Sequence, residues 1–416
     1  MIEKLVKKID YGISEVYFNH IYKSLPLKLR NITSSYVIFI KNFVLHRFEQ
    51  FIPNIYIYQG KNKKDGSKLR LLFFGVDASF KFLSDEFIAE KFFEEMPVKK
   101  KIGRVFVCNI SKIIKKHKCD VVIVKTDRFF KRWLQKKGYL VIPEAIDMEL
   151  DISFPLEDIL KNFDRSAKDD VNKIKKYNLT FETSSNPKKI DYFFNNIFSP
   201  YTREKHKRII IPGSSYYYEI RSIFENGKIL LIKNKDEYIA GTHIYNTSPE
   251  KNKMTTITGI GVKLEKNYKF CGAGSSIFYF FILWAKKQGF TRIDFRATPP
   301  FLNNGIYSFK RKWGCEIKKS KQITRVYAIK VNDKNNNPAI FDFLENNPSL
   351  YFDNNRLNGL ILLNHALNDV EIKRKYKRKY NLGMSKLSVV TKDEIYDIFK
   401  NLINSKQKKV EQKNHD

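Results

Sequence analysis

One glycine-containing segment has residue types and spacing that point directly to chemistry. It reads Lys269-Phe270-Cys271-Gly272-Ala273-Gly274-Ser275-Ser276 and stands between a predicted strand and a strongly apolar helix. Glycines let the main chain turn tightly and approach a ligand, so that the amides of the loop and of the first helical turn point toward one anion. The segment therefore predicts a pyrophosphate cradle, although a Gly-x-Gly pair also precedes many helices that bind nothing.

The elements after this loop favour the cradle. The predicted helix 275–288 is apolar almost all round, so it must be buried on both sides, and its dipole then points at the loop. Gly289 ends the helix as a C-terminal cap, and the predicted strand 291–296 follows at once. Because side chains alternate along a strand, Asp294 and Arg296 lie on the same face.

Hydrophobic periodicity predicts the elements that must hold this loop. In the C-terminal half we expect strands at 179–182, 228–233, 237–246, 254–262 and 291–296, helices at 189–197 and 275–288, a short helix at 305–313, and a last strand region at 315–330. A charged helical segment, 155–178, precedes them.

The N-terminal half shows the same alternation of strands and helices. We expect strands at 69–76, 104–108, 120–125 and 139–142, and helices at 110–118 and 128–137. Thr126 and Asp127 have the residue types of an N-terminal cap for the second helix, and Gly138 closes it. This pattern predicts an α/β domain without a phosphate-binding glycine motif.

The order of these elements resembles that of the GNAT acyltransferase superfamily, whose acyl-CoA pyrophosphate loop reads Gln/Arg-x-x-Gly-x-Gly/Ala. Here a lysine takes the Gln/Arg position, which keeps a cation but loses a planar array of donors. The resemblance implies that acyl-CoA, foremost acetyl-CoA, is the co-substrate. The residues that it assigns to cofactor binding are Lys269, Gly272, Ala273, Gly274, Ser275 and Val262.

A second resemblance is to the FemAB-like and CelD-like acyltransferases. In those families a strand that ends in Asp-x-Gly or a similar triplet precedes a Gly-x-x-x-Phe-Lys helix. Here Asp294-Phe295-Arg296 precedes Gly305-Ile306-Tyr307-Ser308-Phe309-Lys310, and Trp313-Gly314 follows. Arg165 and the basic helix after it resemble that family's Arg-containing entry helix more loosely. The likeness covers about 163–330, and Phe-Lys-x-x-x-Gly is its most specific element.

The predicted fold class is α/β, with tandem GNAT-like domains of mixed, mostly antiparallel sheets flanked by helices, and with helical N- and C-terminal extensions. We expect a helical N-terminal extension at 1–55, a degenerate GNAT-like α/β domain at 56–153 and a GNAT acyltransferase domain at 154–330. A helical C-terminal extension would span 331–416, with helices at 354–368 and 393–403 and a frayed charged tail. The first 53 residues could lie on a membrane surface or pack on the body of the protein.

Acyl transfer to an amine needs a deprotonated nucleophile, a donor for the developing oxyanion and a proton for the leaving group. Tyr307 and Lys310 lie three residues apart on one helical turn, so both can reach a shared site. Lys310 could stabilise a phosphate or the oxyanion, or be a solvated lysine; Tyr307 could protonate a thiolate, or fill the core. Asp294 is a candidate base or anchor for the amine, or the partner of Arg296 or Arg292 in a salt bridge.

The remaining candidates are weaker. Tyr201 and Arg203 fall where FemAB-like chains place acceptor-binding residues, and with Arg296 and Arg165 they make up the predicted substrate-binding set. His243 could act as a base, but a lone histidine is more often a core or surface group. Cys271 has only the helix N-terminus to lower its pKa, so nucleophilic catalysis is not expected.

The charge composition indicates which classes of partner the protein could bind. Lys and Arg number 77 against 44 Asp and Glu, which gives a net charge of +33. Such a field attracts nucleic acid, phosphates or an anionic membrane. The alternative is background composition, because Lys, Asn, Ile and Phe are abundant throughout and the basic residues do not form one stripe.

The four cysteines show neither CxxC spacing nor close histidine partners, so no metal site and no disulfide scaffold is expected. The N-terminus does not resemble a secretory signal, and the longest apolar runs are too short to span a bilayer. We therefore expect a cytoplasmic protein without a transmembrane segment, at most peripheral to the inner membrane surface.

Three functions follow from these observations. The first is an N-acyltransferase that moves an acyl group from acyl-CoA to an amine of a sugar or of a lipid-linked cell-envelope precursor by direct attack. The second, implied by the FemAB resemblance, is aminoacyl transfer from charged tRNA to a peptidoglycan-type precursor. The third is a non-catalytic module that binds polyanions.

Overall fold

The computed structural model describes residues 51–75, 90–206, 223–224, 227–246, 248–250, 252–265, 268, 270–330, 338–376, 379–392 and 394–395, and the isolated positions 21, 24–26 and 33. Lys269, the charged tail and nearly all of the predicted extension 1–55 lie outside these residues, as does 396–403 of the last predicted helix. Contacts divide the described chain into two compact units. Unit 1 contains Met148–Arg296 and Lys310–Cys315; unit 2 contains His46–Asp147, Ala297–Phe309 and Glu316–Asp416.

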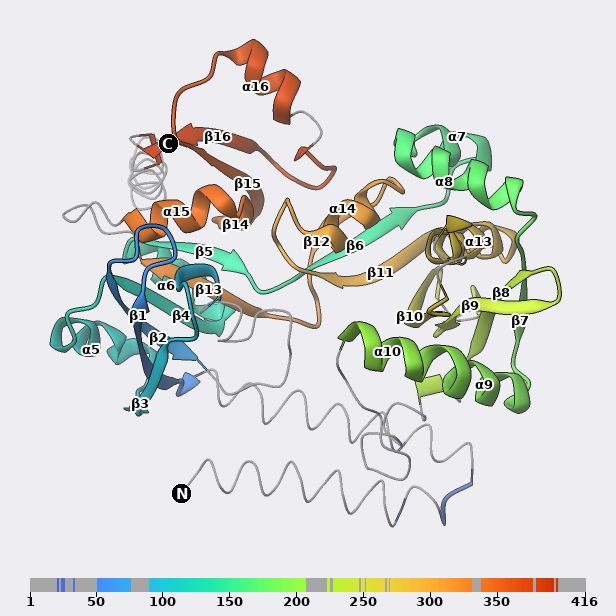
Figure 1. Cartoon of the computed structure of the whole chain (residues 1–416), viewed down its shortest axis with the longest axis horizontal. Helices are drawn as coiled ribbons and strands as arrows, with labels where there is room; N and C mark the ends of the chain where they lie inside the picture. Colours follow the sequence, from blue (N-terminus) through green and yellow to red (C-terminus); the bar gives the residue numbers. More distant parts are fainter. Residues whose placement is uncertain are drawn as a thin grey trace, which may run out of the picture. The chain divides into compact units, whose positions relative to one another are not determined.

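A seven-stranded mixed sheet supports the glycine loop (Figure 1). Its strand order is β12-β6-β11-β10-β9-β8-β7. The strands are β6 (Ile146–Asp151), β7 (Thr180–Ser184), β8 (Lys228–Asn234), β9 (Glu237–Ile244), β10 (Met254–Val262), β11 (Arg292–Thr298) and β12 (Glu316–Lys319). Strands β7 to β10 pair antiparallel, whereas β10 and β11 pair parallel.

Helices cover both faces of this sheet in unit 1. On one face, α9 (Pro187–Phe193) and the π-helix η7 (Phe194–Phe198) pack on Ile229 and Leu231 of β8. On the other face lies α13 (Ala273–Lys287), whose Phe280 stacks on Phe181 of β7 at 4.9 Å. Alternation along the strands explains why one sheet can bury both layers. The prediction that α13 is buried on nearly all sides is confirmed.

Two further helices, α7 (Leu156–Lys161) and α8 (Arg165–Lys176), belong to unit 1, and α10 (Ser199–His206) follows η7. Trp313 is fully buried and packs edge-on against Phe163 and parallel to Phe278, at centroid distances of 5.1 and 6.3 Å. The segment that follows α14 (Gly305–Arg311) therefore completes the core of this unit.

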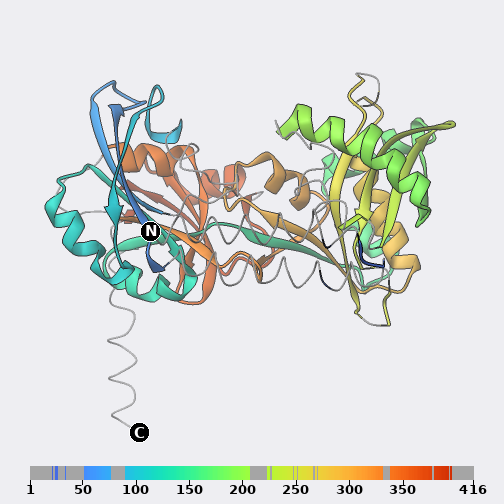
Figure 2. The same ribbon diagram turned by 90° about the horizontal axis from the view of Figure 1, so that it is seen from below.

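Unit 2 is built on a six-stranded sheet with the order β3-β1-β2-β4-β13-β5. Its strands are β1 (Asn54–Lys61), β2 (Lys68–Gly75), β3 (Val98–Arg104), β4 (Val121–Asp127), β5 (Tyr139–Pro143) and β13 (Arg325–Lys330). The pair β2 and β4 is parallel and the other pairs are antiparallel. The helices α5 (Ile110–Lys116), η6 (Arg128–Phe130) and α6 (Lys131–Lys136) follow β3 and β4 (Figure 2).

A buried ion triad lies at the β4-β13-β5 end of this sheet. Glu144 forms an ion pair with Lys125 Nζ at 3.0 Å and accepts a hydrogen bond from Arg325 Nε, and all three side chains are almost fully buried. Because one carboxylate faces two cations, each oxygen of Glu144 has a partner, as a buried charge requires.

The C-terminal segment is not all helical. It contains α15 (Pro338–Asn346) and α16 (Asp369–Tyr376), but also a three-stranded sheet of β14 (Ser349–Asp353), β15 (Arg356–Leu363) and β16 (Leu387–Thr391). The helix predicted at 354–368 is wrong, because β15 occupies most of it. Asn354 has a φ of +53°, so the Asn-Asn pair forms a tight hairpin turn between β14 and β15.

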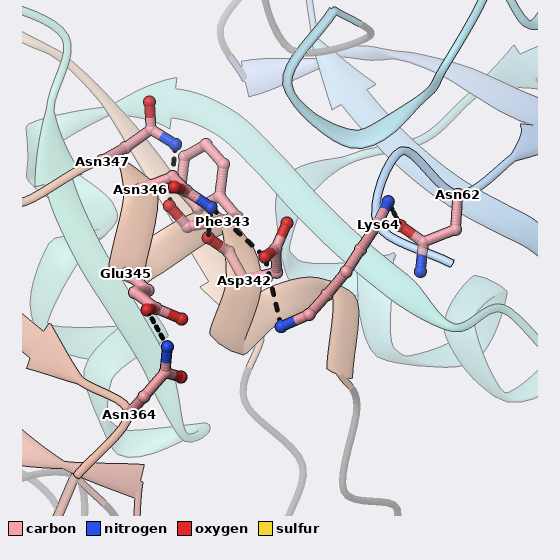
Figure 3. Close-up of polar contacts among 8 residues, drawn as sticks. All are labelled: Asn62, Lys64, Asp342, Phe343, Glu345, Asn346, Asn347 and Asn364. Carbon is pink, nitrogen blue, oxygen red and sulfur yellow. Dashed lines mark hydrogen bonds and ion pairs between the residues drawn. The ribbon is translucent and has the colours of Figure 1, made fainter. Parts of the chain in front are cut away.

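The polar contacts in Figure 3 hold α15 in unit 2. Lys64, in the turn between β1 and β2, pairs with Asp342 of α15 at 3.3 Å. At the C-terminal end of the helix, Asn346 and Asn347 donate their side-chain amides to the carbonyls of Asp342 and Phe343, at 2.9 and 2.7 Å. These bonds satisfy carbonyls that a helix end would otherwise leave open.

The mixed α/β class predicted from the sequence is confirmed. Two strand predictions need correction: β3 lies at Val98–Arg104 rather than 104–108, and the region 315–330 holds two strands that belong to different sheets. No helix in the described part of the chain is long and apolar enough to cross a membrane.

Candidate functional site

A glycine stands at the N-cap of α13. Gly272 takes the N-cap position with a φ of +83°, a left-handed conformation that favours glycine, and it has no side chain with which to cap the helix. The Ala273 amide faces the sulfur of Cys271. A Cβ on Gly272 would lie 3.8 Å from Ile174 and 3.9 Å from Lys173, so the loop runs beside α8. The first amides of α13, including those of Ala273 and Gly274, therefore begin the helix without a side-chain acceptor from an N-cap residue.

A protein carboxylate lies at the first turn of this helix. Asp170 of α8 accepts the hydroxyl of Ser275 at 2.6 Å and pairs with Lys312. The Ser275 hydroxyl is therefore bonded to protein and only its main chain remains a candidate for a phosphate. Sequence reasoning missed this contact, because the two residues are 105 positions apart.

Strands β10 and β11 separate well before Val262, the end of β10. Their parallel pairing runs from Met254–Arg292 to Thr256–Asp294 and stops there. The Thr256 hydroxyl donates to the carbonyl of Asp294 at 2.7 Å, which fixes the last paired position. After it, β10 is bulged between Thr258 and Gly261 and pairs only with β9. Such an opening at the carboxyl ends of two strands gives an extended ligand access to main-chain groups.

Open space connects the loop with the end of β10. A Cβ on Gly274 would meet a single atom within 4 Å, Cγ2 of Val262 at 4.0 Å. Val262 also lines a surface pocket of about 200 Å³. The other residues around this pocket are Asn196, Ile197, Pro200, Lys263, Leu264 and Glu265. Val262 and Gly274, both predicted to bind the cofactor, are thus brought together.

The predicted acceptor residues follow this pocket in α10. Tyr201, next to the pocket residue Pro200, is half-buried, and burial raises the pKa of its phenol. Arg203 is exposed. Arg165, the fourth member of the predicted substrate set besides Arg296, is also exposed and begins α8 after Asp164, whose carboxylate accepts the Ala167 amide at 3.1 Å.

A tether that sequence reasoning missed holds the chain between β10 and the loop. Glu237 of β9 accepts from Lys263 and from the phenol of Tyr268. The hydrogen bond to Glu237 raises the pKa of Tyr268 to about 12, and the bond from Lys263 lowers the pKa of Glu237. Both tyrosine and carboxylate therefore stay in the charge state that keeps the bond over a wide pH range.

Asp294 and Arg296 form a strained turn at the end of the paired part of β11. Arg296 has a φ of +68°, which is uncommon for a residue with a side chain and costs on the order of 1 kcal/mol. Its amide donates to the Asp294 carboxylate at 2.7 Å, and its guanidinium lies 5.9 Å from the ring centroid of Tyr245. Arg292 instead pairs with Glu149 at 3.7 Å.

Of the two predicted catalytic residues on α14, Lys310 reaches this turn. Its ammonium donates to the carbonyl of Arg296 at 3.1 Å, and the residue is 7% exposed. Tyr307 has no exposed surface at all, and its amide donates to the side chain of Asn304, which caps the helix. The structure therefore joins Lys310 with Asp294 and Arg296, while the Tyr307 phenol lies in the interior.

The weaker candidates are buried. His243 is fully buried in β9, where its ring lies 5.2 Å from that of Phe224. Cys271 is 2% exposed, and burial raises the pKa of its thiol, which disfavours the thiolate that a nucleophile needs. Within the described residues, no three His, Cys, Asp or Glu side chains gather in a way that could hold a metal ion.

No protein-family model and no curated protein matches the sequence. Solved structures do match. L-PGS from Bacillus licheniformis covers 68% of this chain and 87% of its own, with 14% identity and a TM-score of 0.32. FemX covers 65% and 83%, with 13% identity and a TM-score of 0.35.

A GCN5-related N-acetyltransferase from Kribbella flavida covers 63% of this chain and 82% of its own, with 10% identity and a TM-score of 0.23. A likeness of this degree decides neither the substrate nor the reaction.

Proposed function

We propose that the chain is an N-acyltransferase that uses acyl-CoA and acylates an amine of a sugar or of a cell-envelope precursor. The observation that carries the proposal is the start of α13. There a left-handed glycine has no side chain with which to cap the helix, near the end of β10, a strand that has already separated from β11. A helix start of this kind attracts a pyrophosphate, and the separated strands offer main-chain groups to the extended chain attached to it.

The pocket beside Val262 supports the same placement of the donor. It lies at the end of β10, and Gly274 faces Val262 across open space. A diphosphate at Gly272, Ala273 and Gly274 would leave the rest of the donor next to this pocket and to Tyr201 of α10. Lys269, which takes the cationic position of the loop in sequence, belongs to the same proposed set.

The proposed reaction is direct attack. The amine nitrogen forms a bond to the acyl carbon, the bond to the thiolate sulfur breaks, and the proton lost by the amine balances the one that the thiolate gains. Asp294 is the proposed base or anchor for the amine, and Lys310 the proposed cation near the developing oxyanion. Because Lys310 is bonded to the carbonyl of Arg296, it also holds the strained turn in place.

One proposed role depends on a change of exposure. Tyr307 is proposed as the proton donor to the thiolate, but its complete burial requires that the surrounding side chains move before it can act. The proposed contacts of the acceptor are Arg296, Arg165, Tyr201 and Arg203.

A second candidate function is aminoacyl transfer from charged tRNA, which the net charge of +33 favours because a basic surface attracts RNA.

A size series at Gly274 tests the proposal. Gly274→Ala adds a Cβ that fits 4.0 Å from Val262, whereas Gly274→Leu fills the space where the donor would lie. Gly274 is inside the helix, where glycine is unfavourable. Neither substitution should therefore lower the free energy of unfolding, and each could raise it by up to about 1 kcal/mol. We expect calorimetric titration with acetyl-CoA to show near wild-type affinity for Gly274→Ala and a loss of at least about tenfold for Gly274→Leu.

Chemical denaturation of the same variants separates lost binding from lost folding. Equal affinity of a folded Gly274→Leu variant and the wild type would contradict the donor site. The same titration with aminoacyl-tRNA distinguishes the two donors: binding of the tRNA with no binding of acetyl-CoA would replace the first proposal by the second.

A further inference from the structure

Three cations lie on one face at the start of α6 in unit 2. Arg128, Lys131 and Arg132 are spaced i, i+3 and i+4 through η6 and α6, the spacing that brings side chains together on a helix. A fourth cation joins them from β12, because the Arg128 guanidinium donates to the carbonyl of Ser320 at 3.1 Å and Lys319 is the residue before it. Four positive charges thus converge from two segments almost 190 positions apart in the sequence.

The central member of this cluster is held in place by the hairpin between β14 and β15. Lys131 is 7% exposed, and its ammonium donates to the Asn355 side chain at 2.5 Å. The ammonium also lies 4.9 Å from the ring centroid of Phe352, and Gln135 donates to the Phe352 carbonyl at 2.5 Å. A neutral amide and a ring face orient this lysine, yet neither neutralises its charge.

Within the described part of the chain, no ion pair satisfies these charges. Among the described residues, Arg128, Lys131, Arg132 and Lys319 have no carboxylate within salt-bridge distance. The two carboxylates on adjoining turns have other partners. Asp127 accepts from the Phe129 amide at 2.7 Å and from the Thr324 hydroxyl at 2.5 Å. Asp353 accepts from Asn354 and Asn358, at 3.1 and 3.4 Å.

The pKa of Lys131 reflects both its burial and the neighbouring cations. Burial, and then the charges of Lys319, Arg128 and Arg132, lower the pKa of Lys131 to about 8. A bound anion would reduce the repulsion among these cations and so favour the charged form of Lys131.

We propose that Arg128, Lys131, Arg132 and Lys319 form a binding site for a phosphate group carried by a larger organic molecule. A phosphate or diphosphate suits the site better than a single carboxylate, because it has more than one negative charge and several acceptor oxygens. The two guanidinium groups supply forked donors of the kind that match phosphate oxygens. The site lies in unit 2 and does not depend on the donor loop of unit 1.

The neighbouring side chain Phe129 fits the organic part of such a ligand. It is 79% exposed, unusually open for a phenylalanine, and stands directly between Arg128 and Phe130. The phosphate could belong to a soluble molecule, such as a nucleoside diphosphate, or to a membrane lipid, and the two sources are separated by experiment.

Binding is measured on the full chain at constant ionic strength with inorganic pyrophosphate. Phe129→Trp places a fluorescent reporter at the site, so its signal, after subtraction of the wild-type signal, does not include binding at the donor loop. In this background we expect Arg128→Ala with Arg132→Ala to raise the pyrophosphate dissociation constant at least about tenfold. The matched control is Lys136→Ala with Lys137→Ala, which removes the same charge from exposed positions next along α6 and should change it less than about twofold.

Lys319→Ala keeps the test valid if the double variant is unstable, because this side chain is exposed and makes no hydrogen bond or ion pair with the described residues. We expect a loss of about threefold. Gly274→Leu should leave the signal unchanged, so failure of the donor proposal and failure of this one are distinguishable. Equal losses in the two double variants, or no signal from residue 129, would overturn the site.

Co-sedimentation with vesicles identifies the source of the phosphate. If vesicles of phosphatidylcholine that contain phosphatidic acid retain the wild type but not Arg128→Ala with Arg132→Ala, the phosphate belongs to a lipid. If ADP competes with pyrophosphate and the vesicles retain neither protein, the ligand is soluble. Both results support the site. If the protein binds neither pyrophosphate nor ADP nor the vesicles, the site is contradicted.

Discussion

The starts of two helices, one in each unit, differ in whether the N-cap side chain accepts a hydrogen bond from the first main-chain amides. In unit 1, Gly272 begins α13 in a left-handed conformation and has no side chain with which to cap the helix. In unit 2, Asp127 begins η6 with an extended backbone, and its carboxylate accepts the Phe129 amide at 2.7 Å. One helix start therefore has main-chain donors to offer, whereas the other has used its donor on the protein itself.

The comparison separates two ways to recognise an anion. At α13, recognition would come from amides and the helix dipole, which are fixed by the fold and do not change with pH. At η6 and α6 it would come from side chains, of which Lys131 titrates with a pKa of about 8. Unit 1 thus suits a donor molecule bound in one geometry, and unit 2 a phosphate whose affinity falls as the pH rises above 8.

The first test replaces the glycine at each end of α13 by alanine. Gly272 and Gly289 have φ values of +83° and +84°, and a Cβ would clash at neither, so an alanine should cost about 1 kcal/mol of unfolding free energy at each. Only Gly272→Ala should also weaken acetyl-CoA binding, by about tenfold, because only it displaces the donor amides. Calorimetry with both variants checks this; equal losses of affinity would show that the helix start has no special role.

Removal of the cap in unit 2 should act on stability alone. Asp127→Ala frees the Phe129 amide and the Thr324 hydroxyl, and we expect a loss of about 1–2 kcal/mol in urea denaturation. Asp127→Asn keeps an acceptor oxygen and serves as the control. A change in acetyl-CoA affinity in Asp127→Ala would break the distinction between the two helix starts.

A pH test addresses the sheet that carries the donor loop. Burial opposes the ionisation of Glu182, but hydrogen bonds from Lys189, Lys233 and Tyr238 prevail and lower its pKa to about 2. Because the folded pKa lies below the unfolded value of 4.5, the contribution of Glu182 is complete above pH 4.5 and is lost as the pH falls toward 2. We expect about 1 kcal/mol after allowance for exposure.

Urea titrations between neutral and acid pH measure this contribution, with Glu182→Gln as the reference. The difference in stability between wild type and variant should shrink through that pH window. A constant difference would mean that the network does not respond to ionisation.

The smallest expected effect concerns the carboxylate beside α13. Asp170→Asn removes a negative charge from the first turn of the helix, where it repels a bound diphosphate. We expect acetyl-CoA to bind about threefold more tightly at low salt, and the gain to vanish at high salt. Weaker binding in this variant would show that Asp170 positions the loop through Ser275 and Lys312.

The sequence predicted the elements around the donor loop because each has a strong local signal. The predicted strand 254–262 coincides with β10, and α13 begins only two residues before its predicted start. Gly289 is predicted as a cap because left-handed positions at helix ends favour glycine, and Gly272 is predicted as a glycine of the phosphate loop; both carry positive φ. Asp127 was likewise recognised as a cap from its residue type.

Contacts between distant segments could not be predicted in this way. The bond between Asp170 and Ser275 joins residues that no local pattern relates. The complete burial of Tyr307 depends on what packs around α14, which its own sequence does not specify. The sequence predicts a helix where β15 lies because a short apolar run, Leu360 to Leu363, fits both the helix and the strand period, and only the hairpin turn before it favours a strand.

The place of Trp313 in the chain affects how the protein emerges from the ribosome. Its partners Phe163 and Phe278 are synthesised first, and about 150 residues of nascent chain must follow Phe163 before the indole exists. Until then unit 1 has an unfilled gap in its apolar centre, a state prone to aggregation. Translation halted before residue 313, or an expression plasmid truncated there, should therefore yield insoluble protein although most of the seven-stranded sheet is already encoded.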